Sequence, residues 1–363
     1  MVRENIENIN PYKPGKPIEE VQRELGLKEI TKLASNENPL GVSPKAVEAM
    51  RKSLGEVNRY PDGNSFYLRD KLARKLNIKP ANIVFGNGSN EIIELSVKAF
   101  LYEHEQAIMS SPDFLIFKLA VLQEAGKPRE VSLDNFYCNL KGILEAVCDK
   151  TKMVFIANPN NPVGTYIKEK GLEDFLNKLP EGIVVVLDEA YYEFARDAEG
   201  YPDSLRFLER PNVIILRTFS KAYGLSGLRL GYGLANEGLI TALNKARQPF
   251  NVNYLAQAAG YAALDDDEFL QKTLKINEEG KIFIYSELNE MGLDYIPSAT
   301  NFIMFNVKRE ADAVFQEMLK AGVIVRSMAS YKLNSWIRVT VGTKDENQRF
   351  VDALRKVVKG EKL

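Results

Sequence analysis

Between residues 83 and 235, short apolar runs rich in β-branched side chains alternate with amphipathic stretches. Most of these runs are apolar throughout, as strands covered on both faces should be. The alternation predicts βα units that build a mostly parallel, seven-stranded sheet within a large α/β/α domain, so the fold class is α/β. The strands are expected at residues 83–85, 107–109, 129–133, 153–157, 183–187, 213–216 and 230–235.

The pattern changes after residue 253, where an alanine-rich helix at 255–264 leads to an acidic break at 265–268. We place a domain boundary at this break, which gives a large domain at 36–264 and a smaller α+β domain at 265–363. The N-terminal segment 1–35 is expected to pack on the small domain or on a partner subunit. The small domain should contain helices to residue 291, at 311–321 and at 346–358, a strand at 301–307, and a strand pair at 323–326 and 336–341.

Charge and composition exclude several classes of protein. Lys plus Arg number 48 and Asp plus Glu number 49, so the net charge of -1 gives no bulk attraction to nucleic acid or to anionic lipid. His104 is the single histidine, which excludes Ser-His-Asp triads and polyhistidine metal sites, and Cys138 and Cys148 indicate neither a disulfide framework nor a zinc site. The sequence has no signal-peptide core and no bilayer-spanning run. We therefore expect a cytoplasmic protein with no metal, nucleic-acid or membrane partner.

A lysine lies where a ligand of such a sheet is expected. Ser220 and Lys221 follow the strand at 213–216, and Arg229 comes after a turn that contains glycine. Ligands of open α/β sheets bind outside the carboxyl ends of the strands, and a partly desolvated amine there suits Schiff-base chemistry. Ser220 and Arg229 would bind a phosphate. The alternative is a solvated surface lysine.

Two polar segments follow neighbouring strands. The strand at 183–187 ends in Asp188, with Tyr191 shortly after it, and the strand at 153–157 is followed by a turn with two prolines that contains Asn161. A carboxylate at this edge needs a cationic partner, and the protonated pyridine nitrogen of pyridoxal phosphate is one. Tyr191 and Asn161 could then hydrogen-bond the ring oxygen. The alternatives are that Asp188 caps the next helix and that Asn161 belongs to an ordinary turn.

A glycine turn at residues 86–91 links the first strand to a helix. Free N–H groups at a helix start bind phosphate, and the two glycines allow a close approach of the backbone. We expect Ser89 to be the N-cap and to touch the phosphate as well. A dinucleotide-binding turn is the competing interpretation, but Glu91 replaces the third glycine of that fingerprint.

These four segments, in this order and at these separations, resemble the fold-type-I aminotransferases, which use pyridoxal 5'-phosphate. Further segments look like the histidinol-phosphate aminotransferase family within them, at residues 11–15, 32–41, 59–62 and 339–343. The resemblance covers nearly the whole chain. It implies a fold-type-I transferase with a large cofactor domain and a smaller α+β domain.

The resemblance also implies roles for single residues. Lys221 would carry the cofactor as a Schiff base and act as general base and acid, with Asp188 on the pyridinium and Tyr191 as the further catalytic residue. The cofactor would contact Ser89, Asn90, Phe114, Asn161, Asp188, Tyr191, Ser220, Lys221 and Arg229, with Tyr60 reaching the phosphate of the other subunit in an obligate homodimer. The substrate would contact Tyr12, Asn36, Arg326 and Arg338.

The implied reaction is transfer of the amino group of L-histidinol phosphate to 2-oxoglutarate in histidine biosynthesis, which gives imidazole-acetol phosphate and glutamate. Three alternatives stay open: a threonine-phosphate decarboxylase, an aromatic amino-acid aminotransferase, and a non-catalytic protein with this fold. Two features depart from the family. Phe114 stands where a tyrosine often stacks on the cofactor ring, and residues 329–335 replace a glycine-rich segment before Arg338.

Overall fold

The structure is a computed structural model that describes residues 1–11 and 15–360. It divides into two compact units. The first unit comprises Met1–Asn10, Val42–Asn161 and Thr165–Leu270, and the second comprises Pro11–Gly41, Pro162–Gly164 and Gln271–Leu363. The boundary therefore lies inside helix α12 (Asp267–Glu290), not after residue 264, and the N-terminal segment is divided between the units. Within the acidic break, Asp266 is buried and accepts a hydrogen bond of 2.5 Å from Ser43 Oγ, whereas Asp265, Asp267 and Glu268 are exposed.

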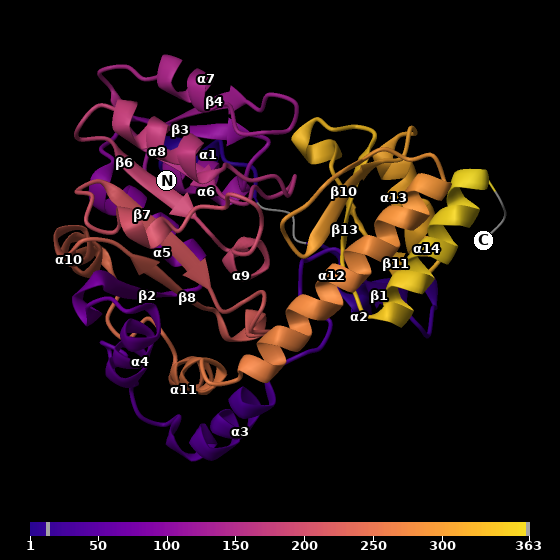
Figure 1. The fold of residues 1–363 in the computed structure, drawn as a ribbon, viewed down its shortest axis with the longest axis horizontal. Helices are drawn as coiled ribbons and strands as arrows, with labels where there is room; N and C mark the ends of the chain where they lie inside the picture. Colours follow the sequence, from indigo (N-terminus) through magenta and orange to yellow (C-terminus); the bar gives the residue numbers. More distant parts are fainter. Residues whose placement is uncertain (12–14, 361–363) are drawn as a thin grey trace. The chain divides into compact units, whose positions relative to one another are not determined.

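The first unit contains the seven-stranded sheet (Figure 1). Its strands lie in the order β2-β8-β7-β6-β5-β3-β4, and β8 alone runs antiparallel to its neighbours. All seven strands expected from the sequence occur in it. Their bounds are β2 Ile83–Asn87, β3 Gln106–Ser111, β4 Lys127–Ser132, β5 Thr151–Ala157, β6 Val184–Asp188, β7 Val213–Thr218 and β8 Leu230–Leu234.

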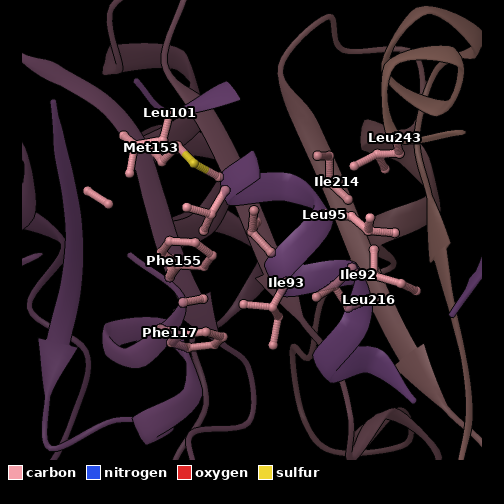
Figure 2. Close-up of a cluster of buried hydrophobic side chains, with 14 of the residues drawn as sticks. Ile92, Ile93, Leu95, Leu101, Phe117, Met153, Phe155, Ile214, Leu216 and Leu243 are labelled. Carbon is pink, nitrogen blue, oxygen red and sulfur yellow. The ribbon is translucent and has the colours of Figure 1, made fainter. Parts of the chain in front are cut away.

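Helices cover both faces of the central strands. Every residue of β7 is buried, and alternate residues of a strand point to opposite faces, so neither face of β7 is open to solvent. Ile214 and Leu216 pack in a core cluster with α5, α6 and α10. Figure 2 shows side chains of α5 within this cluster, among them Ile92, Ile93 and Leu95, together with Phe117, Phe155 and Leu243. The edge strand β4 differs, because several of its residues are exposed.

The helices of this unit begin at residues that suit their position. Ser43, Asn139, Asn236 and Asn253 each accept a backbone N–H at the start of a helix, which satisfies a donor that has no partner within the helix. The helices are α1 Glu4–Glu7, α3 Pro44–Ser53, α4 Phe66–Leu76, α5 Ser89–Phe100, α6 Leu115–Gln123, α7 Leu140–Glu145, α8 Glu169–Lys178, α9 Tyr192–Ala195, α10 Glu237–Ala246 and α11 Tyr254–Ala263. Short 3-10 turns lie at Leu54–Glu56, Pro80–Asn82, Ser204–Phe207 and Ser226–Leu228.

The second unit contains two small sheets. One is the antiparallel sheet β12-β13-β10-β9, and the other is the parallel pair β1-β11. The strands are β1 Thr31–Lys32, β9 Tyr295–Ile296, β10 Phe302–Asn306, β11 Val323–Ile324, β12 Arg326–Ser327 and β13 Trp336–Thr340. They pack with α2 Ile18–Leu25, α12, α13 Ala311–Lys320 and α14 Lys344–Lys359, and Ala329–Tyr331 forms a 3-10 turn.

The strand pair expected at 323–326 and 336–341 is only partly correct. The first run is divided, so that β11 pairs with β1 while Arg326 and Ser327 pair with β13. Since β1 and β9 have two residues each, neither is long enough to show a periodicity in the sequence.

Candidate functional site

The topology of the first unit brings the polar segments to one edge of the sheet. Strands β2, β3, β5, β6 and β7 run in the same direction, so their carboxyl ends lie at the same edge. The antiparallel strand β8 begins at this edge, because Asn87 pairs with Leu230 and Thr218 pairs with Gly231. Arg229, which precedes β8, therefore lies beside the ends of β2 and β7. This explains how residues distant in sequence meet.

Asp188 is the last residue of β6 and is buried. Burial raises the pKa of this carboxyl to about 7; the N–H of Ala190 opposes the rise, Glu189 adds to it, and Lys221 opposes it. Asp188 accepts the Ala190 N–H at 3.1 Å and does not cap α9, whose N-cap is Tyr191. A buried carboxylate of this kind is stabilised by a nearby cation.

Lys221 and Tyr191 lie close to Asp188. The Nζ atom of Lys221 is 5.9 Å from the centroid of the Tyr191 ring, and its charge acts on the Asp188 carboxyl. Tyr191 is 3% exposed, whereas Lys221 is half-buried. The amine is thus partly desolvated beside an aromatic ring and a carboxyl, and it is no solvated surface lysine.

The start of α5 forms a cradle with Arg229. The N-cap is Gly88, with φ 79° and no side-chain cap, so the expectation that Ser89 is the N-cap was wrong. Gly88 adopts a positive φ, which favours glycine, and so takes the position before the helix. Ser89 is therefore the first helical residue and not the residue before it. A Cβ on Gly88 would lie 2.6 Å from Arg229 Nη2. The uncapped helix start and the guanidinium together suit a phosphate.

Ser220 completes this corner of the edge. It is buried, and its Oγ accepts a hydrogen bond of 2.9 Å from the Thr218 hydroxyl. Asn90 follows Ser89 in the first turn of α5. The four residues assigned to a phosphate thus come from the ends of β2 and β7 and from the start of β8.

Phe114 and Asn161 lie in the loops that follow β3 and β5. In the sheet these two strands are on the opposite side of β6, which ends in Asp188, from β7 and β8. Phe114 is the N-cap of α6 after β3, and Asn161 follows β5. The turn after β5 is fixed by Asn158, whose Oδ1 accepts the Ile167 N–H at 2.7 Å and whose carbonyl accepts the Tyr201 hydroxyl at 2.5 Å. This agrees with a rigid turn.

Two buried charged residues, for which the sequence pattern predicted no role, lie beside this edge. Glu189 and Arg217 form an ion pair of 2.9 Å, and both side chains are at most 1% exposed. Glu189 also accepts from the Ser204 hydroxyl, and the Arg217 guanidinium lies 3.4 Å from the centroid of Tyr192. Because Glu189 follows Asp188 and Arg217 precedes Thr218, the pair joins the two strand ends that carry Asp188 and Lys221. In the sequence, the only sign of this pair is that Glu189 and Arg217 are charged residues at the ends of two otherwise apolar runs.

Tyr60 lies on the surface of the first unit. It is 84% exposed, and its ring stacks on Phe250 with the centroids 4.9 Å apart. The other exposed apolar residues of the same unit include four that are near Tyr60 in sequence, namely Leu54, Val57, Phe66 and Tyr67. We call these six residues the aromatic surface.

Of the expected substrate residues, Asn36, Arg326 and Arg338 belong to the second unit, and Tyr12 lies outside the described residues. Arg326 and Arg338 are direct partners across the β12–β13 ladder. Like charges opposite each other destabilise a strand pair, so this arrangement suits an anion.

Backbone and side-chain contacts fix these groups within the second unit. Arg338 is 8% exposed and donates from Nη2 to the Ala34 carbonyl at 3.0 Å. The N–H of Asn36 donates to Thr340 Oγ1 at 2.9 Å, and the Asn36 carbonyl accepts from Asn301 at 3.0 Å. These bonds attach the segment around Asn36 to β13 and β10.

Two features are absent from the described part of the chain, a metal-binding cluster and a membrane-spanning helix. No group of three or more His, Cys, Asp and Glu side chains there could hold a metal ion. None of its helices combines the length and the apolar character needed to cross a bilayer.

Comparisons with known proteins identify the family of the chain. The family model for aminotransferase class I and II matches residues 28–354. Histidinol-phosphate aminotransferase 2 of Carboxydothermus hydrogenoformans is 51% identical and covers 99% of both chains. The histidinol-phosphate aminotransferase of Desulfotalea psychrophila is 47% identical over 99% of this chain and 95% of its own length.

A solved structure gives the same result. The histidinol-phosphate aminotransferase from Sinorhizobium meliloti, in complex with pyridoxal-5'-phosphate, superposes with a TM-score of 0.91 at 30% identity, covering 99% of this chain and 98% of its own. The chain therefore belongs to the class I and II aminotransferases and, within them, to the histidinol-phosphate aminotransferase family. The predicted fold class and family are confirmed.

Proposed function

We propose that the protein is a pyridoxal-phosphate-dependent aminotransferase that transfers the amino group of L-histidinol phosphate to 2-oxoglutarate. The observation that carries this proposal is the convergence of Lys221, Asp188 and the Gly88–Arg229 cradle at one edge of the sheet. The relatives named above, at 51% and 47% identity over nearly the whole chain, support the substrate.

The residues at the sheet edge fit the cofactor in two respects. The pKa of Asp188, which burial raises to about 7, shows what burial of its charge costs, and a pyridinium beside it would offset this cost. The uncapped start of α5, with Arg229 beside Gly88, offers N–H groups and a cation to a phosphate.

The cofactor would be held from several sides. Ser89, Asn90, Ser220 and Arg229 would hold its phosphate, Asp188 its ring nitrogen, Asn161 and Tyr191 its ring hydroxyl, and Lys221 its aldehyde carbon, while Phe114 would stack on the ring. When bound, pyridoxal phosphate supplies an electron sink for the carbanion that forms when a proton leaves the substrate carbon.

The protein's own groups move that proton. Lys221 Nζ would take the proton from the substrate carbon as general base and, as general acid, deliver it to the former aldehyde carbon of the cofactor, which amino-group transfer requires. Asp188, if ionised, keeps the ring nitrogen protonated. The buried ring of Tyr191, whose centroid lies 5.9 Å from Nζ, would flank the amine on one side.

Arg326 and Arg338 would bind the anionic groups of the substrates. Both substrates carry such groups, a phosphate in one and two carboxylates in the other, and paired guanidiniums recognise both kinds of group in a bidentate manner. Asn36, held by Thr340 and Asn301, would contribute its amide. Tyr12 is proposed for the same role from the sequence resemblance alone.

We also propose that the protein works as a homodimer with shared sites, in which Tyr60 contacts the cofactor phosphate of the partner subunit. The aromatic surface supports this, because Tyr60 with Phe250 and Phe66 with Tyr67 form two exposed ring pairs, and a partner subunit would remove such apolar groups from water. A cytoplasmic location agrees with the free thiols of Cys138 and Cys148.

The test is the visible absorbance of the purified protein before and after addition of L-histidinol phosphate without an acceptor. Phenylalanine and threonine phosphate are added to parallel samples, and Lys221→Ala is the control. We expect a yellow chromophore that only histidinol phosphate discharges in the wild type and that no donor discharges in the variant.

Other outcomes separate the alternatives. Discharge by phenylalanine would indicate an aromatic amino-acid aminotransferase, and release of carbon dioxide from threonine phosphate would indicate a decarboxylase. A chromophore that no amino donor discharges would indicate a binding protein, and a colourless protein would exclude the cofactor.

A further inference from the structure

A second buried carboxyl lies near Asp188. Asp113 stands between β3 and α6, directly before Phe114, and is 7% exposed. Its Oδ1 accepts the Phe114 N–H at 2.8 Å and Asn160 Nδ2 at 3.1 Å. Its Oδ2 is buried and has no hydrogen-bond partner among the described residues. This carboxyl takes no part in the mechanism above.

The contacts of Asp113 connect two loops of the proposed cofactor site. Asn160 precedes Asn161 in the turn after β5, and its Nδ2 also approaches the Pro112 carbonyl at 3.5 Å. Its backbone N–H donates to the Thr165 carbonyl at 2.8 Å, which fixes the turn from its other end. One carboxyl oxygen therefore holds the segment that presents Phe114 to the turn that presents Asn161.

The surroundings determine which of the two carboxyls keeps its charge. Burial raises the pKa of Asp113 well above its ordinary value; the Phe114 N–H opposes the rise, and Asp188 adds to it. Lys221 lowers the pKa of Asp188, whereas no lysine or arginine among the described residues does this for Asp113. The other titratable neighbour is the Cys138 thiol, whose pKa burial raises to about 12, so it supplies no charge at neutral pH. The Asp188 carboxylate disfavours a second negative charge on Asp113, and the buried Asp113 Oδ2 has no hydrogen-bond partner among the described residues that would stabilise one.

We propose that Asp113 is a positioning residue of the cofactor site that acts as a neutral carboxylic acid, joining the Phe114 segment to the Asn161 turn and leaving the negative charge to Asp188. The inference rests on the proposed function, since Phe114 and Asn161 serve there as cofactor contacts. It identifies a residue whose side chain is required for its shape and hydrogen bonds, not for its charge.

The test compares Asp113→Asn with Asp113→Ala in the holoenzyme. Asparagine keeps the accepting oxygen and is neutral, so it should retain the wild-type midpoint when the visible absorbance is titrated with pH, and a cofactor dissociation constant within about twofold of wild type. Alanine removes both bonds, so cofactor binding should weaken by about tenfold or more and the absorbance midpoint should move. Asp174→Asn, the same change at an exposed position of α8, should change neither value.

Each result decides the proposal. It is overturned if Asp113→Asn moves the midpoint as far as Asp113→Ala does, because the charge would then be what matters, or if Asp113→Ala leaves both values unchanged. Thermal unfolding of the cofactor-free variants separates the effect from misfolding. If Asp113→Ala does not fold, the asparagine variant alone decides. A wild type without a chromophore would overturn the proposed function together with this inference, whereas failure in the variants alone leaves the proposed function intact.

Discussion

At the residue scale, Asp188 shows a conflict between stability and chemistry. The ordinary pKa of an aspartate is 3.8, and burial raises that of Asp188 to about 7. Between these values the folded protein binds more protons than the unfolded chain, so the free energy of unfolding falls as pH rises from about 4 to about 7. The negative charge that suits a pyridinium therefore destabilises the cofactor-free protein.

Asp188→Asn should therefore stabilise the cofactor-free protein while it impairs the enzyme. At pH 8 we expect a gain in the free energy of unfolding on the order of 4 kcal/mol, since the pKa rises from 3.8 to about 7 and each pKa unit corresponds to about 1.4 kcal/mol. The gain should shrink as the pH falls toward 4 and disappear below the ordinary pKa of 3.8, where the carboxyl is protonated in both states. Urea unfolding at both pH values measures this, with Asp149→Asn as the exposed control. A gain that does not depend on pH would contradict the assigned cause.

The turnover of Asp188→Asn provides a second measurement. Loss of the charge beside the ring nitrogen should lower kcat/KM by several kcal/mol of transition-state stabilisation, which is at least about a hundredfold. A decrease of tenfold or less would count against this role.

Lys221→Ala should abolish transamination without unfolding the protein. The phosphate contacts proposed for Ser89, Ser220 and Arg229 do not depend on the lysine, so the variant should still bind the cofactor. Transamination is measured by the turnover of L-histidinol phosphate, and retention of the fold is measured by the midpoint of thermal unfolding. Turnover near the wild-type rate would exclude Lys221 as the catalytic base.

The sequence predicted Lys221, Asp188 and Asn161 as site residues because each lies at or shortly after the end of an apolar run, and parallel strands end at one edge. It could not identify the roles of Asp113 or of the Glu189–Arg217 pair. Their partners lie on other strands, and nothing in the local pattern distinguishes a buried charge from an exposed one.

At the element scale, the contact of α5 with β8 determines the phosphate cradle. A Cβ on Gly231 would collide with the backbone of Gly88 at 2.6 Å and with the backbone of Ser89. Gly231→Ala should therefore push the start of α5 away from β8. We expect the free energy of unfolding to fall by about 1–3 kcal/mol, the usual effect of overpacking, and cofactor affinity to fall with it.

Gly227→Ala is the matched control for this prediction. It lies nearby in the 3-10 turn Ser226–Leu228, and a Cβ there would meet nothing within 4 Å. Cofactor titration and urea unfolding of both variants give the comparison. Equal affinity in the two variants would show that the close packing of α5 on β8 does not shape the cradle.

At this scale the sequence predicted all seven strands of the large sheet, since each is a continuous apolar run or has β-branched residues between turns. It did not predict β1 and β9, nor the division of residues 323–327 between two sheets. Pairing of two-residue strands depends on tertiary contacts that a local pattern does not contain. The N-cap of α5 was misplaced by one residue, because the φ of Gly88 decides it.

At the scale of the whole molecule, the proposal of a homodimer depends on Tyr60, which would complete the site of a second subunit. A tyrosine expected at a cofactor phosphate is 84% exposed in the single chain, within an aromatic surface. Burial of large apolar side chains stabilises association at about 25 cal/mol per Å², and a shared site would explain why Tyr60 lies on the surface of the single chain.

Mixing two inactive variants tests whether the sites are shared. In a heterodimer of Lys221→Ala and Tyr60→Ala subunits, one site combines both substitutions and the other contains Lys221 of one subunit and Tyr60 of the other. After unfolding and refolding the mixture together, half the dimers should be heterodimers, so about one quarter of wild-type activity should return at limiting cofactor. Each variant refolded alone is the control. Activity equal to the average of the two controls would mean that each subunit builds its site alone, and light scattering on the same samples would show whether the dimer forms at all.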